Sequence, residues 1–553
     1  MRLWAGCPAT CTTGLRLAEV KSHTEVELKF QVPATARPEL VAELARGLAT
    51  HRTSLVAMYL DTDDWRLAKA GLAWRLRREG RCWIQTLKAG GTNALERFEH
   101  EVVRPGASHD ASAHANTPPG DKLITLLRRA QKDGVEPGIR FQTEVRRTTR
   151  RVRTRGAVVE VAFDEGRLVS NNSSQRIREI EFELTSGSAA AMLELVERWR
   201  RRFGLLYEPR SKAERGHRLA KGSPSPPLRK ASPLRYSDEA TATEAFGHVI
   251  DECLAQMTRN AVGLVEGDPA LRVEHVHQLR VGIRRLRSAL LSFRSWVSLP
   301  SAELVEALRA VFATLGRSRD SDVLDSGVVT ELAKVGAPPL SLSGRIGGPD
   351  PAEVVGSAET QQMFLGWITW RAVQVEPQAD PASSGGEALP GAVQADGQSS
   401  GAVGAPAESK RKQPEEMRSA RSNAQAFRRN AERRLRRWHA RIVVDWNAFD
   451  ELDEAGLHAL RKRIKRQRYA VEFFEPVLRR RKVQRYLKPL TAIQERMGEL
   501  NDLFVARAKY EALVVSDPAA WFALGWLTAR IAAVRALAKP ELGRLLGVDP
   551  PTS

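Results

Sequence analysis

Three charged residues near the start of the chain have the types and the spacing to bind an anion together with a metal ion. Glu25, Glu27 and Lys29 alternate with apolar residues in the stretch TEVELKF, residues 24–30. Successive side chains of a β-strand point to opposite faces, so this spacing predicts a strand with all three charges on one face. Carboxylates coordinate Mg²⁺ or Mn²⁺, and an ammonium group attracts the phosphate oxygens that such ions also bind.

The same alternation recurs along most of the first 190 residues. Strands are expected at 55–62, 72–79, 82–89, 97–103, 141–147, 157–166 and 176–187, with helices at 38–50, 121–132 and 188–203. Turn residues separate several strands, at Arg78-Glu79-Gly80, Gly90-Gly91-Thr92 and Asp164-Glu165-Gly166. The polar faces of these strands carry Arg75, Arg77, Thr86, Lys88, Arg97, Glu99, Glu101, Glu179, Glu181 and Glu183.

Two arrangements of these strands fit the pattern. A half-exposed sheet would present its charges to water, which is the usual place for any single charged residue. Yet nearly every strand carries Glu, Arg or Lys on one face, with few Ser, Thr or Gln. A closed antiparallel barrel would turn these charges inward, where unpaired charge is too costly for an ordinary core. Such an interior suits a polyphosphate bound together with a divalent metal.

The composition favours a soluble, cytoplasmic protein with an anionic partner. The 553 residues carry a formal net charge of +20, and both halves of the chain share the excess of basic residues. Four scattered cysteines are too few for a disulfide framework, which favours a reducing compartment. No stretch approaches the ~20 apolar residues of a membrane span. Residues 1–22 lack a signal-peptide pattern and are expected to be a disordered extension.

The second part of the chain is predicted to be helical and repeated. Residues 221–237 form a Pro/Ser-rich linker, and 238–545 follow a helical period apart from an insertion at 373–415, which is expected to be disordered. The stretches HQLRVGIRRLR (277–287) and HALRKRIKRQR (458–468) place histidine and basic residues in steps of 3, 4 and 3, on one helical face. These residues are His277, Arg280, Arg284, Arg287, His458, Arg461, Lys465 and Arg468.

The two basic faces predict contacts to a polyanion. Inorganic polyphosphate and nucleic acid would both give sequence-independent, salt-sensitive binding. Nucleic acid is the less favoured of the two because, beyond Tyr469, the faces hold almost no aromatic residues on which bases could stack. A single charge run is usually a solvated helix face, but the repetition of the same positions argues against that interpretation.

The order of these motifs resembles a known family. Residues 24–220 resemble a CYTH domain, the triphosphate tunnel metalloenzyme fold, and residues 238–545 resemble a CHAD domain. The expected fold is therefore multi-domain, with an α+β antiparallel closed barrel at 23–220 followed by an all-α domain of two repeated four-helix halves. The matching stretches of the first domain are EVELK (25–29), YLDT (59–62), LAWRLR (72–77), QTLK (85–88), RFE (97–99), TEVRR (143–147), FDEG (163–166), EIEFEL (179–184) and SKAERG (211–216).

The resemblance, which extends to bacterial two-domain inorganic triphosphatases, implies a role for each matching residue. The implied activity is hydrolysis of inorganic triphosphate to pyrophosphate and phosphate with Mg²⁺ or Mn²⁺, and the helical domain would bind polyphosphate. The residues implied to bind the metal are Glu25, Glu27, Glu179, Glu181 and Glu183. Those implied to bind phosphate are Arg75, Arg77, Lys88, Arg97, Arg147 and Lys212. Those implied to act in catalysis are Lys29, Glu99 and Asp164. The eight basic residues of the repeated helices would hold polyphosphate.

Two alternatives remain open at this point. The chain could act on an organic triphosphate such as thiamine triphosphate or ATP, as a hydrolase or a cyclase, although Trp65, Trp74 and Trp83 fit a core at least as well as a pocket at the mouth of the barrel. It could instead be a polyphosphate-binding adaptor without catalysis. Glu101 is given less weight as a site residue than the other charged residues of the strands. The polar loop 104–121 is expected to be flexible and is assigned no role.

Overall fold

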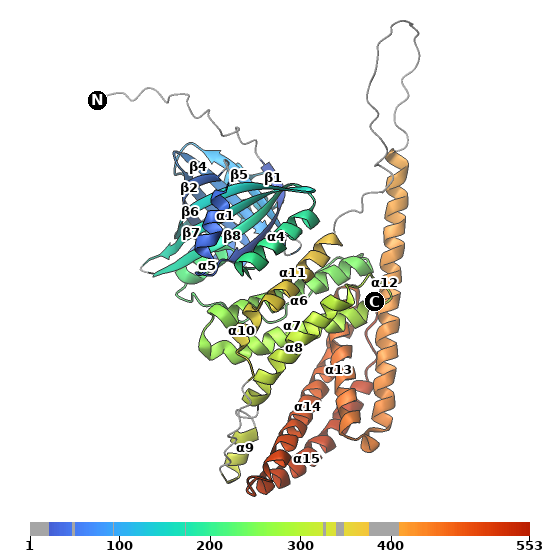
Figure 1. Cartoon of the computed structure of the whole chain (residues 1–553). Coiled ribbons are helices and arrows are strands. Elements are labelled where there is room, and N and C mark those ends of the chain that lie inside the picture. The colour runs from blue at the N-terminus through green and yellow to red at the C-terminus, as the bar shows by residue number, and fades with distance from the viewer. Residues whose placement is uncertain are drawn as a thin grey trace, which may run out of the picture.

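The described part of the chain folds into a barrel followed by an assembly of helices (Figure 1). This computed structural model describes residues 21–553 apart from 47–49, 92, 94, 172, 324–327, 339–347 and 375–408. The side chains of 21–24, 317–323 and 409–420 are likewise not described. The predicted extension at 1–22 lies outside the described residues except for Lys21 and Ser22, which begin the first strand.

Eight antiparallel strands close into the predicted barrel. They follow the order β5-β4-β3-β2-β6-β7-β8-β1, and β1 pairs back with β5, where Glu25 lies opposite Arg97. The short β9 (Leu206–Tyr207) extends the sheet beside β1. The barrel strands are β1 (Lys21–Gln31), β2 (Thr50–Asp61), β3 (Leu72–Glu79), β4 (Cys82–Gly90), β5 (Glu96–Arg104), β6 (Gly138–Thr154), β7 (Ala157–Ser170) and β8 (Ser173–Gly187).

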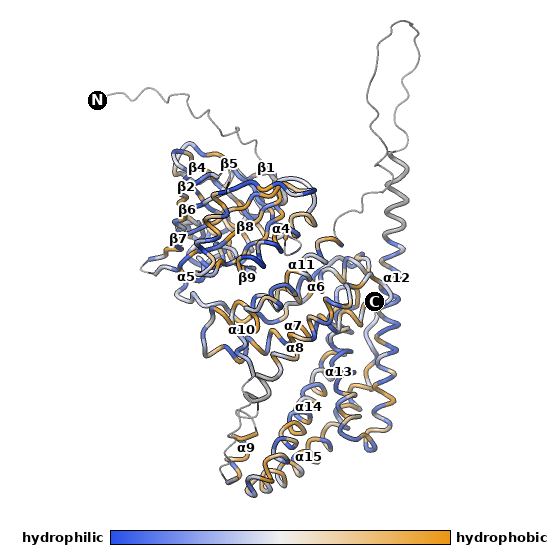
Figure 2. Tube along the Cα trace, in the orientation of Figure 1, coloured by the Kyte–Doolittle hydropathy of each residue, from blue (hydrophilic) through white to orange (hydrophobic). Residues whose placement is uncertain are grey.

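The apolar residues of the strands mostly face outward, and helices cover them. Hydrophilic and hydrophobic residues alternate along the strands (Figure 2). Trp199 of α4 (Ala189–Phe203) packs edge-on against Phe182 of β8, and Leu123 of α3 (Pro118–Lys132) is buried with Trp74 and Leu87. The core of this domain therefore surrounds the barrel, and much of the interior is left to charged residues. The other helices of the domain are α1 (Arg37–Ala45), α2 (Arg66–Lys69) and α5 (Lys212–Ala220).

The helix α5 packs inside the sheet rather than on its outer face. Its Ala213 and Leu219 join Phe141 and Leu168 in a small apolar cluster. The contact is close, because a Cβ at Gly216 of α5 would lie 2.0 Å from the ring of Phe141. Strand periodicity puts Phe141 on the same side of β6 as Arg147, so α5 lies directly beside the charged part of the interior.

The predicted turn at Asp164-Glu165-Gly166 is wrong, because β7 runs straight through it. Gly166 serves close strand packing instead, since a Cβ there would lie 1.9 Å from the carbonyl oxygen of Glu144 on β6. The chain turns only at Asn171, which adopts a left-handed φ of 49°.

The loop 104–121 is ordered, contrary to the prediction. It contains a short 3₁₀ helix (Ala111–His114) and buries His114 completely. The His114 ring contacts the ring nitrogen of His100 at 2.7 Å and the side-chain nitrogen of Gln85 at 3.0 Å. Composition alone missed this because the loop is held by polar contacts to residues that are distant in the sequence.

The helical domain consists of the two predicted halves, each with four long helices. The insertion predicted at 373–415 lies largely outside the described residues, and a helix already begins at Ser409. The first half holds α6 (Ala242–Glu266), α7 (Arg272–Phe293), α8 (Ala302–Val323) and α11 (Ala358–Val373), with the short α9 (Val329–Lys334) and α10 (Pro351–Gly356). The second half holds α12 (Ser409–Asn447), α13 (Glu454–Phe474), α14 (Arg480–Leu513) and α15 (Ala520–Leu546).

Within the described residues, α15 has the length and hydropathy of a membrane span. It nevertheless packs along α14 and buries Leu527, Ile531 and Val534, as the core helix of a globular domain does. By itself, this helix is weak support for membrane insertion.

The linker at 221–237 and the first helical half hold the two domains together. Arg229 of the linker pairs with Glu252 of α6 at 2.7 Å, and the hydroxyl of Tyr236 donates to the carbonyl of Phe473. A single apolar cluster continues from Leu28 and Phe30 of β1 into the helical domain. The barrel therefore rests on the helices through a shared core.

Candidate active site

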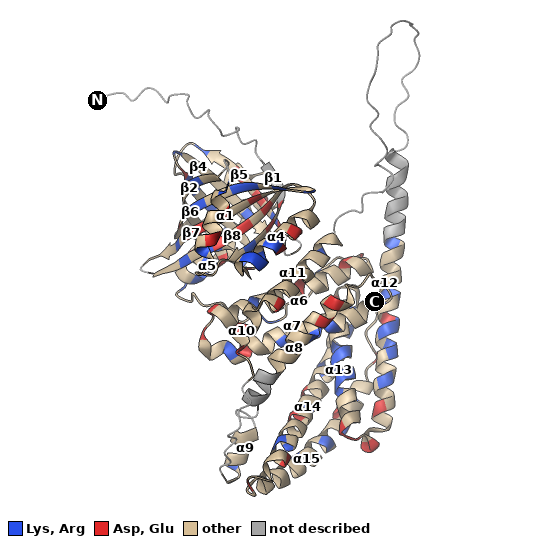
Figure 3. Ribbon diagram, in the orientation of Figure 1, with Lys and Arg blue, Asp and Glu red and all other residues tan. Residues whose placement is uncertain are grey.

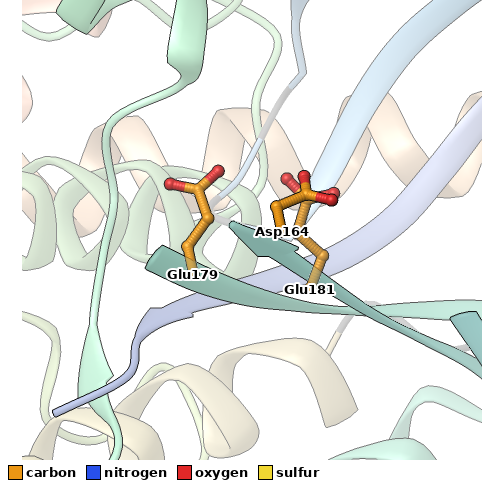
Figure 4. Close-up of side chains that lie close together, drawn as sticks. All are labelled: Asp164, Glu179 and Glu181. Carbon is orange, nitrogen blue, oxygen red and sulfur yellow. The ribbon is translucent and has the colours of Figure 1, made fainter. Parts of the chain in front are cut away.

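Three carboxylates gather inside the barrel on two neighbouring strands (Figure 4). Asp164 of β7 lies opposite Glu179 of β8 in the strand register, and Glu181 follows Glu179 on the same face. Each residue offers an oxygen within 4.8 Å of the others. Asp164 and Glu179 are buried, with exposed fractions of 1% and 0%. We call these three residues the acidic trio.

Three cations neutralise the acidic trio. Lys212 Nζ lies 2.7 Å from both Asp164 and Glu181, and it also pairs with Glu179. Arg147 donates to both oxygens of Asp164 at 2.7 Å and to Glu181 at 2.5 Å. Arg215 donates to Glu179 at 2.8 Å. The trio is therefore part of a buried ionic network.

This pairing keeps the network charged. Although burial opposes ionisation, Lys212 and Arg147 hold the pKa of Glu181 well below its ordinary value. Burial likewise opposes the charge of Lys212, but Asp164 and Glu179 raise its pKa well above the ordinary value. At neutral pH Glu181 is therefore available as an anionic ligand, and Lys212 is available as a cation for phosphate oxygens.

A second ionic group lies on the strands where the barrel closes. Lys88 of β4 pairs with Glu25 at 3.1 Å and also with Glu99, and Arg97 of β5 pairs with Glu27 at 2.7 Å. Although burial opposes ionisation, Lys88 and Arg97 hold the pKa of Glu27 below its ordinary value.

The arginines of β3 extend this second group. Arg75 lies 3.3 Å from Glu99, and Arg77 lies 3.3 Å from Glu101. Glu101 also accepts a hydrogen bond from the hydroxyl of Thr86 at 3.0 Å. Glu101, whose role in the site was given less weight in the prediction, therefore belongs to the same network.

Lys29 and Glu183 also lie in the interior, where neighbouring opposite charges offset their burial less fully. Lys29 is 3% exposed, and burial lowers its pKa. Glu183 lies opposite Glu27 on one side and Glu160 on the other in the strand register. Burial and the neighbouring Glu160 raise the pKa of Glu183 to about 7.

The structure brings some of the predicted site residues together. Asp164, expected to hold a metal or orient a water, lies with Glu179 and Glu181, whereas Glu25, Glu27 and Glu183 are not members of that trio. Arg215 was missed. Its signal was available, because it follows Lys212 by three residues on one helix and therefore shares its face.

The acidic trio fits a divalent cation by its donor set. Carboxylate oxygens are the ligands that Mg²⁺ and Mn²⁺ prefer, and three of them converge within the barrel. Lys212 now occupies the same oxygens, so an ion and this ammonium group would share them.

In the helical domain, the two predicted basic helices lie against each other. α7 packs on α13, and burial together with nearby Arg284 lowers the pKa of Arg461. The Nε atoms of both arginines are buried and lack a hydrogen-bond partner among the described residues. Figure 3 shows further basic residues on α12 and α13. The two halves thus bring their basic faces together.

The remaining basic residues of this surface have internal contacts. Arg280 and Arg287 lie over the ring of Phe312 on α8. Arg468 pairs with Glu472, and His458 contacts the side-chain oxygen of Asn501 at 2.8 Å. The His458–Asn501 contact joins α13 to α14, between residues that lie 43 positions apart in the sequence.

Comparison with known proteins finds a family model that matches part of each domain. The CYTH domain family matches residues 23–217, and the CHAD domain family matches residues 248–511. An inorganic triphosphatase of Haemophilus influenzae is 29% identical over 200 residues, which are 35% of this chain and 54% of that protein. The chain thus matches about half the length of this relative.

Two solved structures also align with parts of the chain. The CHAD domain from the plant Ricinus communis is 25% identical and covers 59% of this chain and 99% of its own, with a TM-score of 0.42. The PH1819 protein from Pyrococcus horikoshii is 22% identical and covers 34% of this chain and 96% of its own, with a TM-score of 0.22.

Proposed function

We propose that this chain, in which a CYTH domain is followed by a CHAD domain, hydrolyses inorganic triphosphate to pyrophosphate and phosphate with a divalent metal ion. One observation carries the proposal. The interior of the closed barrel holds two networks of paired charges, with carboxylates and cations in contact. Buried ion pairs contribute little net stability, so such an interior is better explained by a ligand than by folding.

The paired charges give the barrel a way to accept a metal–phosphate complex without leaving charge uncompensated. Arginine and lysine side chains would exchange carboxylate partners for phosphate oxygens, and the released carboxylates would face the metal. The acidic trio, with Glu25, Glu27 and Glu183 nearby on β1 and β8, would hold the ion. The phosphate chain would contact Arg75, Arg77, Lys88, Arg97, Arg147 and Lys212.

When bound, the metal supplies Lewis-acid stabilisation of charge on the phosphate oxygens. The chain's own residues position the substrate and exclude water from the charged interior. Lys29, which is buried and has a lowered pKa, would donate a hydrogen bond to a phosphate oxygen. Asp164 and Glu99 would orient the attacking water or accept its proton, since both are buried carboxylates beside cations.

The direct test is phosphate release from triphosphate by the full chain, with Mg²⁺, with Mn²⁺ and with a chelator. We expect metal-dependent release that Glu27→Gln reduces at least about a hundredfold, because the ion would lose an anionic ligand and Arg97 its paired carboxylate. Glu144→Gln is the matched control, since Glu144 pairs with Arg167 on the exposed face of β6 and β7. Release that survives Glu27→Gln, or that proceeds equally with chelator, would remove the proposed function.

For the helical domain we propose binding of inorganic polyphosphate between α7 and α13. The supporting observation is the closeness of Arg284 and Arg461, whose like charges lack a carboxylate partner at ion-pair distance among the described residues. A polyanion would neutralise both. Arg280→Ala combined with Arg461→Ala should weaken polyphosphate retention at least about tenfold and leave triphosphate turnover nearly unchanged. Unaltered retention would make these helices ordinary solvated faces.

A second candidate substrate, an organic triphosphate, is favoured by a cleft at the rim of the barrel. This cleft of about 380 Å³ lies between the barrel and α6 and shares Arg97 with the interior network. Its lining includes Tyr207, Leu234 and Ile368, which could pack against an organic group. Ala255→Trp would fill the cleft, so it should suppress turnover of ATP or thiamine triphosphate and spare inorganic triphosphate. Equal effects on all three substrates would exclude this candidate.

A further inference from the structure

A short segment of the chain joins the charged interior of the barrel to the helical domain. Residues 208–215 leave β9 and enter α5, which carries Lys212 and Arg215 to the acidic trio. We call residues 208–215 the connecting segment. Its contacts lie on three sides, toward β1, toward the acidic trio and toward α6.

On the barrel side, the connecting segment forms a hydrogen bond to the backbone of Lys29 on β1. The backbone N–H of Glu208 donates to the carbonyl oxygen of Lys29 at 2.9 Å, and Gln31 donates to the carboxylate of Glu208 at 2.7 Å. Glu208 is 1% exposed, and despite its burial the pairing with Arg210 lowers its pKa to about 2. The segment therefore contacts the strand that presents Lys29.

On the other side, two residues of α6 hold the connecting segment from the helical domain. Arg259 donates to both carboxylate oxygens of Glu214, in one case at 3.0 Å. Arg210 bonds Glu208 and also reaches Glu266 at 2.5 Å. Arg259 and Glu266 are seven residues apart, so they lie on the same face of α6.

We propose that Arg259 and Glu266 of the helical domain are positioning residues for the tunnel, because they fix the connecting segment and thereby Lys212 and Arg215. This inference rests on the proposed function. The helix α5 has nine residues, and helices this short are marginal without tertiary contacts. Its N-terminal turn is held by the Ser211 cap and by the Glu214–Arg259 pair, and Lys212 lies in that same turn. The helical domain in this sense helps to position residues of the tunnel.

The test exchanges the charges of the pair in the full chain. Glu214→Arg and Arg259→Glu each place like charges together, so each should lower kcat on triphosphate at least about tenfold, with a smaller change in KM. The double variant restores an opposite pair and should recover kcat to within about threefold. Hydrogen exchange of the α5 amides supplies a second readout, faster in each single variant and slow again in the double variant.

The matched control is Arg428→Ala, which removes an arginine of α12 that contacts Asp238, just after the linker, and does not touch the connecting segment. It should leave kcat and α5 exchange unchanged. The proposal is overturned if the single variants keep the wild-type kcat, or if the double variant is no better than the slower single variant. If the wild-type chain releases no phosphate, the proposed function fails, and α5 exchange still decides whether α6 fixes this helix.

Discussion

Replacing Glu181 by glutamine isolates one charge of the buried network while keeping the shape of the side chain. Glu181 contacts Arg147 at 2.5 Å and Lys212 at 2.7 Å, and its side chain is 15% exposed. The trio and its three cations carry equal numbers of formal charges, so Glu181→Gln leaves one more buried positive charge than negative charge.

The size of the effect follows from that imbalance. Breaking a buried ion pair by removing one partner costs about 3–5 kcal/mol. Asp164 still contacts both Arg147 and Lys212, so the lower end of this range applies, and we expect a loss of about 3 kcal/mol in the free energy of unfolding of the barrel. Triphosphate turnover should also fall, because the trio loses an anionic ligand.

The assay is urea unfolding of the full chain, followed by hydrogen exchange of the β6–β8 amides, which reports the barrel separately from the helices. Glu144→Gln is the matched control, since surface pairs such as Glu144–Arg167 contribute only about 0–1 kcal/mol. A loss for Glu181→Gln no larger than that of Glu144→Gln would refute the reasoning, because it would mean that the interior charges are solvated and not mutually dependent.

Three further predictions concern other parts of the molecule. Burial lowers the pKa of His114 to about 4, whereas its value in the unfolded chain is near 6.5. The neutral ring therefore stabilises the fold fully above pH 6.5, and this stabilisation is lost as the pH falls toward 4. Wild type should lose up to about 3 kcal/mol more than His114→Asn between these pH values in urea unfolding, and parallel pH profiles would contradict this. Gly216→Ala should lower the free energy of unfolding by about 1–3 kcal/mol in the same assay, because its Cβ would lie 2.0 Å from the Phe141 ring. The control is Gly71→Ala, where the added Cβ meets no atom and only the positive φ is tested. Polyphosphate retention should weaken with salt, and Arg284→Gln with Arg461→Gln should reduce the log–log salt slope by about one to two; an unchanged slope would place the polyanion elsewhere.

The local sequence was enough to predict strands with one charged face and a pair of matching basic helices. Charges with a period of two, as in Glu25, Glu27 and Lys29, specify which face of a strand is polar, and the repeated spacing of His277 and His458 specifies matching helices. Both signals are local, because they depend on strand and helix geometry alone. The same local rules misassigned Asp164-Glu165-Gly166 as a turn, where Gly166 is instead required by the close approach of β6.

Contacts between distant residues were decided only by the tertiary structure. Closure of β1 on β5 brings Lys88 to Glu25, 63 residues away, and the packing of α5 brings Lys212 to Glu181 and Arg215 to Glu179. The bond between Arg259 and Glu214 joins two domains, and no spacing in the sequence predicts it. The residue types and their spacing determine which charges are present and which face of a strand or helix carries them. The partner of each charge depends on strand register, barrel closure and domain docking. These in turn arise from the packing contacts of the whole chain.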